Sequence, residues 1–170
     1  MNFKYLSFLK TRIRILTMAI IVLVVSSIFF KALFSKITLV RTPSVKYHVF
    51  WTNPLKKEMI KKNQYIRIIT DKIKNNLCDQ DPAKKNHGKC LVVKRVGCPS
   101  GSHLMQQGPD YYCDGEKISQ GLEGKKLFKF NGIIPAGKYF LIGDHKYSYD
   151  SKAVGFFNEE EINAILVPLF

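Results

Sequence analysis

Acidic residues are scarce in this sequence of 170 residues. It contains 13 Asp and Glu against 27 Lys and Arg, which leaves a net charge of +14. An excess of this size is found in proteins that bind nucleic acid, and it equally suits a protein that lies against anionic lipid headgroups. Apolar residues make up 46% of the chain, which argues against disorder and allows one domain of ordinary size with a short appendage.

The sequence also lacks internal repeats and, beyond residue 34, any apolar pattern long enough for a helix of three turns. Short strand-like segments are separated by turn residues at intervals of about 8 to 12 residues, which predicts a mainly β domain of short antiparallel strands. Strands are expected within 35–51, 65–70, 91–97, 134–143 and 160–170, the last as a strand pair or an edge strand. Asp114-Gly115 predicts a hairpin and Asn131-Gly132 a turn, while 71–90 is expected to be an exposed insertion or loop and 143–155 a loop.

No two of the four cysteines are separated by two residues, as the ligands of many structural zinc sites are. The spacings between Cys78, Cys90, Cys98 and Cys113 are 12, 8 and 15 residues, which fit no common zinc finger, so no metal site is expected. An even number of cysteines in an oxidising compartment predicts two disulfides. Three pairings are possible, and we favour Cys78–Cys90 with Cys98–Cys113 because each closes a short loop.

One long apolar run is present near the N-terminus. Residues 15–30 are uncharged and mostly apolar, and the segment 15–34 would form a helix of roughly 30 Å, about the thickness of the hydrocarbon core. A cleaved signal peptide is the alternative, but Phe29, Phe30 and Lys31 provide no small-x-small cleavage site. We therefore expect a transmembrane anchor at 15–34.

Basic residues on both sides of the anchor bear on its orientation. Those before it are Lys4, Lys10, Arg12 and Arg14, and those at or after its end are Lys31 and Lys36. The positive-inside tendency favours a basic cytoplasmic N-terminus at 1–14 and an extracytoplasmic β domain at 35–170, which is also where all four cysteines lie. We expect a single-pass protein of the inner (cytoplasmic) membrane with its β domain on the periplasmic side.

Two adjacent cations interrupt the apolar run LVVKRVG at 91–97. Alternation along a strand puts Lys94 on one face with Val92 and Val96, and Arg95 on the other. Burial disfavours the charged form of an amine, so a lysine held on an apolar face can act as a general base, for which serine is the usual nucleophilic partner. A strand lysine that reaches into water is the alternative, and the pattern alone does not decide which cation is buried.

Three segments together resemble the type I signal peptidases, the S26-like Ser-Lys peptidases. Thr42-Pro43-Ser44 follows the apolar segment as their serine box does, LVVKRVGCP (91–99) resembles their lysine box, and GDHKYSYDSKAVG (143–155) resembles their last box, GDxxxSxDSRxxG. The order and spacing match over nearly the whole chain. The short chain, the single anchor and the GDHxxSxDS form are similar to the TraF-type branch, which processes pilins in conjugative transfer.

The resemblance implies a signal-peptidase-like β domain behind one transmembrane helix, with a role for each matching residue. Ser44 corresponds to the nucleophile and Lys94 to its general base. Ser148 corresponds to the serine that hydrogen-bonds the lysine amine and orients it. Thr42 lies where the general signal peptidases place a hydroxyl facing the oxyanion, beside the backbone N–H of Ser44 as the other donor.

The last box also carries residues that the resemblance assigns to support. Asp150 and Lys152 match the ion pair that braces the loop of Ser148, and Gly143 and Asp144 would shape the backbone beside the site. Lys152 replaces the family's arginine, and lysine cannot form the same planar bidentate pair. The turn at 97–101 also departs from the family's Gly-x-Pro-Gly-Asp, since it reads Gly-Cys-Pro-Ser-Gly.

Histidine offers a rival serine–histidine arrangement. The four candidates are His48, His87, His103 and His145. His145 lies in the last box, but histidine is not the base in the family resembled, so we interpret it as structural or substrate-facing.

The sequence therefore predicts a membrane-anchored serine endopeptidase that cleaves the leader of an exported precursor, most simply a pilin, at small residues and without a cofactor. Ser44 is ten residues beyond Phe34, at most about 33–36 Å of extended chain from the anchor. The alternatives are a general signal peptidase I, or a non-enzymatic disulfide-stapled module of a secretion apparatus that docks a partner near Lys84-Lys85. Nucleic-acid binding is disfavoured because the lysines lie in loops without interleaved aromatics.

Overall fold

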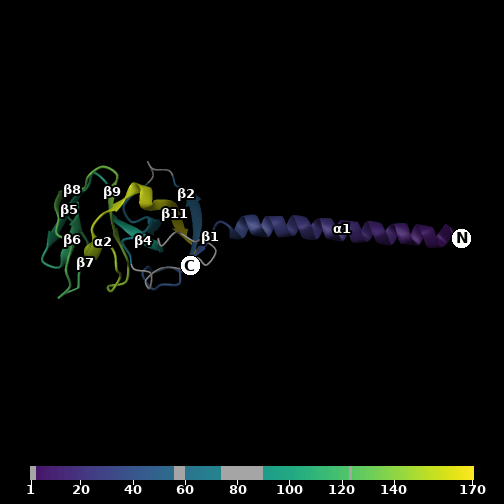
Figure 1. Ribbon diagram of the computed structural model, residues 1–170, viewed down its shortest axis with the longest axis horizontal. Helices are drawn as coiled ribbons and strands as arrows, with labels where there is room; N and C mark the ends of the chain where they lie inside the picture. Colours follow the sequence, from purple (N-terminus) through teal and green to yellow (C-terminus); the bar gives the residue numbers. More distant parts are fainter. Residues whose placement is uncertain (1–2, 56–59, 74–89, 123) are drawn as a thin grey trace. The chain divides into compact units, whose positions relative to one another are not determined.

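The computed structural model describes residues 3–55, 60–73, 90–122 and 124–170 (Figure 1). The chain divides into two units, Met1–Ile37 and Thr38–Phe170. The first unit consists mainly of one helix and the second is the β domain, and each is described by itself.

Helix α1 (Phe3–Phe34) has 32 residues and ends where the apolar segment was expected to end. It begins well before residue 15, because the backbone of the basic segment ahead of the apolar run is also helical. The part Arg12–Phe34 is long and apolar enough to cross a membrane by length and composition. The hydroxyl of Ser26 donates to the carbonyl of Val22 at 2.8 Å, which satisfies this polar group within the helix, as a lipid environment requires.

The β domain has short strands in two sheets (Figure 1). The strands are β1 (Ile37–Leu39), β2 (Val49–Pro54), β3 (Tyr65–Thr70), β4 (Cys90–Cys98), β5 (His103–Gln107), β6 (Asp110–Cys113), β7 (Glu116–Gln120), β8 (Asn131–Ile133), β9 (Lys138–Ile142), β10 (Phe157–Asn158) and β11 (Ile162–Pro168). Two short helical segments are α2 (Ser151–Val154) and the 3₁₀ turn η3 (Glu159–Glu161). The order is β1-β2-β11-β3-β4-β9-β10 in the larger sheet and β7-β6-β5-β8 in the smaller. All the pairings among the strands from β2 through β11 are antiparallel in the described residues, so the predicted mainly β fold is confirmed.

Strand β4 is buried on both faces because the larger sheet has a core on each side. Val92 and Val96 pack with Ile66 of β3 in one apolar cluster. Val93 packs with Phe50 of β2 in another. Alternation then assigns position 94 to the face of Val92 and Val96.

The two sheets share a third apolar cluster. It joins Phe140 of β9 to Leu104 of β5 and Tyr111 of β6, and all three side chains are fully buried. In Figure 1 the strands β5 to β8 lie beside β9, on the opposite side of the domain from β2 and β11. The smaller sheet is therefore packed against the larger one through its apolar face.

Some local expectations are confirmed and others are wrong. Asp114 and Gly115 form the hairpin turn between β6 and β7, and both have positive φ angles, 52° and 83°, as this turn type requires. Asn131-Gly132 is not a turn: it lies in β8, where Asn131 pairs with Met105 of β5 and the sheet supplies the backbone hydrogen bonds. The loop expected at 143–155 contains the short helix α2, which starts at the N-cap Asp150.

The C-terminal strand β11 is neither an edge nor a pair, because it lies between β2 and β3 in the larger sheet. Three consecutive residues, Ala164, Ile165 and Leu166, are buried, which is the pattern of a strand covered on both faces. The periodicity of a short apolar run does not distinguish a buried strand from a helix, so it could not predict the central position of β11.

A disulfide joins the end of β4 to β6. It connects Cys98 and Cys113, with an S–S distance of 2.01 Å and a Cα–Cα distance of 5.5 Å, so one expected pairing is confirmed. Cys90 is also disulfide-bonded. Its expected partner Cys78 lies outside the described residues, as do residues 74–89 of the expected insertion.

Candidate active site

Lys94 is a buried lysine in the middle of β4, with only 3% of its surface exposed. Its Nζ donates a hydrogen bond to the hydroxyl of Ser148 at 2.8 Å, although the two residues are 54 positions apart in sequence. The neighbouring Arg95 is half-buried, and its Nε donates to Asp144 Oδ1 at 2.7 Å. The structure thus places Lys94 on the inner side and Arg95 on the outer one.

Ser44 lies in the segment between β1 and β2, and its backbone is tied to the last box. Its carbonyl accepts hydrogen bonds from the backbone N–H groups of Asp144 at 2.8 Å and His145 at 3.4 Å. Its hydroxyl lies 3.2 Å from Thr42 Oγ1, at hydrogen-bonding distance. The serine box is therefore positioned by contacts with a segment about a hundred residues later in the chain.

One pocket of about 340 Å³ brings these residues together. Its lining consists of Thr42, Pro43, Ser44, Ile73, Lys94, His145, Tyr147, Ser148 and Tyr149. The expected nucleophile, base and orienting serine thus surround a single hollow. A hydroxyl, a buried amine and a second hydroxyl around one hollow are the groups that a serine–lysine hydrolase uses.

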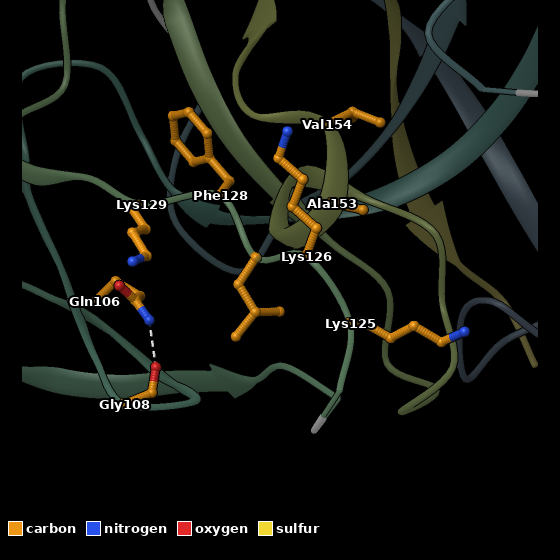
Figure 2. Close-up of a pocket in the computed structure, with 9 residues that line it drawn as sticks. Gln106, Gly108, Lys125, Lys126, Phe128, Lys129, Ala153 and Val154 are labelled. Atoms are coloured by element: carbon orange, nitrogen blue, oxygen red, sulfur yellow. Dashed lines mark hydrogen bonds between the residues drawn. The ribbon is translucent and has the colours of Figure 1, made fainter.

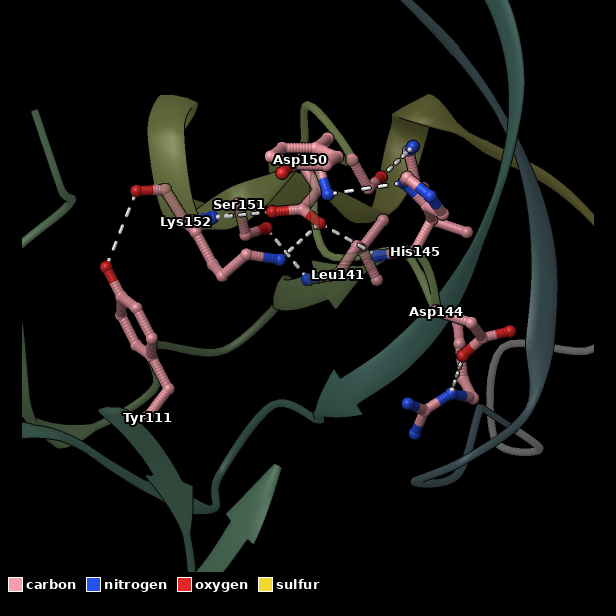
Figure 3. A network of polar contacts seen from close by, with 12 residues as sticks. Tyr111, Leu141, Asp144, His145, Asp150, Ser151 and Lys152 are labelled. Carbon is pink, nitrogen blue, oxygen red and sulfur yellow. Dashed lines mark hydrogen bonds and ion pairs between the residues drawn. The ribbon is translucent and has the colours of Figure 1, made fainter. Parts of the chain in front are cut away.

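Asp150 organises the loop that carries Ser148 (Figure 3). This fully buried carboxylate accepts hydrogen bonds from the Gly143 N–H at 2.8 Å, the Lys152 Nζ at 2.6 Å and the Lys152 N–H at 3.0 Å. A buried ion pair is tolerated when further hydrogen bonds satisfy its oxygens, as they do here. The expected Asp-Lys brace is therefore formed, with Gly143 joined to it.

Gly143 has no room for a side chain. A Cβ at this position would lie 2.0 Å from Ser148 Oγ, 2.3 Å from Ser148 Cβ and 2.6 Å from the carbonyl oxygen of Ser44. Backbone of the last box thus passes directly against both the serine that holds Lys94 and the serine box. Glycine is needed here for close approach.

Asp144 is the centre of a second polar network, on the outer side of β4. Besides Arg95, it accepts hydrogen bonds through Oδ2 from the hydroxyl of Tyr65 at 2.7 Å and the Lys46 N–H at 3.0 Å. Burial alone would raise the pKa of Asp144, but these donors and the charge of Arg95 outweigh it and hold the pKa below its usual value. Burial and the adjacent carboxylate raise the pKa of Tyr65.

Several supporting contacts were not expected from the sequence. The Ser151 hydroxyl accepts a hydrogen bond from the buried N–H of Leu141 at 2.8 Å, which ties α2 to β9. The Tyr111 hydroxyl donates to the carbonyls of Phe128 at 2.8 Å and Lys152 at 3.4 Å (Figure 3). Burial, with the charge of Asp150, raises the pKa of Tyr111 to about 12. Only Ser151 had a sequence signal, since it lies inside the last box.

The histidines give a rival serine–histidine site little geometric support. His145 lines the pocket, but its Nδ1 accepts from the backbone N–H of Tyr147 at 3.3 Å, within its own loop. His48 Nδ1 lies 3.2 Å from the Val40 carbonyl, and His103 belongs to the smaller sheet. His87 lies outside the described residues. Among the residues that the structure describes, no group of three or more His, Cys, Asp and Glu could hold a metal ion.

Comparison with known proteins places the chain in a family. A search of curated proteins found no match. A solved signal peptidase I from Enterococcus faecalis V583 is similar in structure with a TM-score of 0.43, at 17% sequence identity, covering 66% of this chain and 99% of that chain. The family described as signal peptidase, peptidase S26, matches residues 9–169, nearly the full length. The chain therefore belongs to the signal peptidase family, peptidase S26.

Proposed function

We propose that this protein is a membrane-anchored serine endopeptidase that cleaves the leader peptides of exported proteins, with Ser44 as nucleophile and Lys94 as general base. Family membership supports a signal peptidase function. The observation that carries the finer assignment is the buried Lys94 Nζ, held at 2.8 Å by Ser148 beside the pocket that contains Ser44.

The first step requires Lys94 in its neutral form. A lysine surrounded by apolar side chains loses the hydration that favours the ammonium form, whereas a lysine in water stays protonated and cannot accept a proton. Neutral Lys94 takes the hydroxyl proton of Ser44 as the serine oxygen attacks the scissile carbonyl. The Ser148 hydroxyl keeps the amine directed at the pocket, because it accepts a hydrogen bond from Nζ and so fixes the direction of one N–H bond.

The oxyanion that forms on the scissile carbonyl needs hydrogen-bond donors. The backbone N–H of Ser44 and the hydroxyl of Thr42 are the proposed donors. In the structure the Thr42 hydroxyl lies 3.2 Å from Ser44 Oγ, which supports a role beside the reacting carbonyl. One such donor is typically worth about 2.7–4 kcal/mol of transition-state stabilisation.

The tetrahedral intermediate then breaks down to the acyl-enzyme. Protonated Lys94 returns its proton to the leaving amine as the peptide bond breaks, which leaves an ester between Ser44 and the substrate's acyl group. Lys94 is neutral again once it has protonated the leaving amine, and it then takes a proton from a water molecule that attacks this ester. The bond between Ser44 Oγ and the acyl carbon breaks, Lys94 returns the proton to Ser44 Oγ, and the acid product leaves and ionises, so one lysine serves both half-reactions.

The helix and the disulfides of the chain support a proposal for its location. We propose that helix α1 anchors the chain in the inner membrane with residues 1–14 in the cytoplasm and residues 35–170 on the periplasmic side. The Cys98–Cys113 disulfide supports an oxidising compartment. The substrate would then be a membrane-associated precursor, and the GDHxxSxDS form of the last box favours a pilin of a conjugative-transfer apparatus.

The dyad is tested by cleavage assays on the full chain in detergent micelles. Ser44→Ala and Lys94→Ala should each abolish processing of a pilin precursor, while Ser119→Ala and Lys138→Ala serve as matched controls outside the pocket and should cleave at wild-type rates. Circular dichroism verifies that all four variants fold. Wild-type cleavage by either pocket variant would refute the dyad. Absence of cleavage by the wild-type protein would favour a non-enzymatic interaction module.

A parallel assay separates the substrate classes. Processing of a general secretory precursor, but not of the pilin precursor, would assign the chain to general signal peptidase activity instead. The pH dependence tests the base: kcat/KM should rise with pH at values well below the ~10.4 of a solvated lysine. A rise confined to the region near pH 10 would mean that Lys94 acts as a solvated amine.

A further inference from the structure

A second hollow of about 440 Å³ adjoins the proposed active site. Its lining consists of Leu122, Lys125, Lys126, Leu127, Lys146, Tyr147, Ser148, Tyr149, Lys152 and Ala153. Tyr147, Ser148 and Tyr149 also line the pocket of Ser44 and Lys94, so the two hollows meet at this segment. A polypeptide that lies across Ser44 therefore has its neighbouring residues within reach of the second hollow.

The second hollow carries three exposed cations at its margin: Lys125, Lys126 and Lys146. The Lys146 Nζ lies 4.8 Å from the centre of the Tyr147 ring. In the described part of the chain, none of the three lysines forms an ion pair with a carboxylate. Lys152 differs, because its charge is already paired with Asp150 inside the domain.

Apolar groups also line the second hollow. Leu122 and Leu127 are half-buried, and with Ala153 they form much of the remaining lining. A concave apolar surface with cations at its margin fits a peptide segment that combines an apolar side chain with acidic ones. It does not fit a basic segment, which the lysines would repel.

The positive charge continues away from the active site into a third hollow, of about 1070 Å³. Lys125 and Lys126 line both hollows, and Lys129 adds a further cation beside Gln106 (Figure 2). The segment 125–129 thus lies between two hollows that share its lysines. The charges follow a path that begins at Ser148 and leads away from the catalytic residues.

We propose that the second hollow is a specificity subsite of the peptidase. Its lysines Lys125, Lys126 and Lys146 bind an acidic segment of the substrate next to the cleaved bond. The proposal rests on the proposed peptidase function, since it assigns the chemistry of that substrate. The basic hollow adjoins the Ser44 pocket through one segment, 147–149, so an extended substrate enters it on one side of the scissile bond only. Anionic lipid is the other possible ligand of exposed lysines, but a concave subsite continuous with the catalytic pocket favours the substrate chain.

The test compares alanine-rich peptides that carry one leucine and a pair of Glu, Gln or Lys residues. The pair is placed either before or after the cleaved bond. The full chain in zwitterionic detergent should cleave the Glu peptide with a kcat/KM roughly fivefold to tenfold above the Lys peptide, for one of the two placements only. The difference should shrink at about 0.5 M salt, because the lysines are exposed.

Charge reversal of the subsite supplies the matched variant. Lys125→Glu with Lys126→Glu should abolish or invert the ratio of kcat/KM between the Glu and Lys peptides. The control is Lys61→Glu with Lys138→Glu, which makes the same change in net charge at exposed positions that line none of the three hollows. An unchanged preference in the subsite variant, an equal change in the control, or an equal effect on both sides of the bond would overturn the proposal.

Binding separates this inference from the proposed function. The Ser44→Ala protein should bind a fluorescein-labelled Glu peptide, measured by anisotropy, and the binding should weaken when Lys125→Glu and Lys126→Glu are added. If wild type cleaves no peptide but this charge-dependent binding is present, the ligand assignment stands and the peptidase proposal falls. If the two changes affect binding to anionic phosphatidylglycerol vesicles but not to any peptide, the lysines form a lipid contact and the subsite is refuted.

Discussion

Replacing Gly143 with alanine should inactivate the enzyme while leaving it folded. The added Cβ would lie 2.0 Å from Ser148 Oγ, and ordinary contact begins near 3.4 Å, so the hydroxyl would have to retreat by about 1.4 Å. A displacement of that size breaks its 2.8 Å hydrogen bond with Lys94. The Ser44 carbonyl, 2.6 Å from the added carbon, would be displaced as well.

Two magnitudes follow from these displacements. Overpacking of a buried site typically costs about 1–3 kcal/mol, which corresponds to a fall in Tm of about 4–12 °C for a domain of this size. A shift of about 1 Å in catalytic groups can lower the rate by about 10²-fold. We therefore expect Gly143→Ala to lose at least about 10²-fold in kcat/KM in a peptide cleavage assay, at a temperature below its reduced Tm.

A control glycine on β4, the strand that carries Lys94, makes the comparison specific. At Gly97 the nearest atoms to an added Cβ would belong to side chains rather than backbone: Ile142 Cδ1 at 3.1 Å, and Ile118 Cδ1 and Ile142 Cγ1 at 3.2 Å. Gly97→Ala should therefore keep near-wild-type kcat/KM. In a double-mutant cycle the stability losses of Gly143→Ala and Ser148→Gly should be less than additive, because the second change removes the Ser148 atoms that clash and leaves only the Ser44 carbonyl. Wild-type kcat/KM in Gly143→Ala would refute the proposed arrangement around Ser148.

Three further predictions concern the stability of the β domain. The pKa of Asp144 is lowered from 3.8 in the folded protein, so its contacts stabilise the fold above about pH 4 and are lost as the pH falls through the lower folded value. The Tm of the wild-type protein should therefore drop more steeply below pH 4 than the Tm of Asp144→Asn. Parallel Tm curves for the two proteins would contradict this. Ser151→Ala leaves the buried N–H of Leu141 without its acceptor and should cost about 1–3 kcal/mol in denaturant unfolding, whereas a loss within error would show that another group replaces it. The double change Cys98→Ala with Cys113→Ala opens a loop with a sequence separation of 15 and should lower the free energy of unfolding by about 3 kcal/mol, and unchanged stability would exclude a structural role for this disulfide.

The fold class was accessible from the sequence because its signals are local. The run YIRIIT predicted β3 at its observed boundaries, and Asp114-Gly115 predicted the hairpin turn through its backbone preference. Asn131-Gly132 carried a similar signal, but pairing with β5 overrode it. The central position of β11 was not predictable from its own residues, because strand order is decided by long-range pairing.

The residues of the candidate site were predicted from two kinds of signal in the sequence. Alternation assigned Lys94 and Arg95 to opposite faces, but the choice of Ser44 and Ser148 depended on the resemblance of three boxes to a family. The contacts of Asp144 with Tyr65, and of Ser151 with Leu141, join segments whose register is set only by the folded sheets. Such hydrogen bonds leave no periodic pattern in the sequence, so only the structure could reveal them.

The place of β11 has a consequence for the timing of assembly. Strands β2 and β3 are made early in synthesis, yet they meet through β11, which is made after the other strands. Until residues 162–168 are available, each of the two strands presents an open edge, and the larger sheet cannot close. Pairings between distant segments are slow to form, so the growing chain has an incomplete sheet until its last strand has been made. Proteolytic activity would therefore begin only once β11 has inserted between β2 and β3, which delays cleavage until the whole domain has been synthesised and folded.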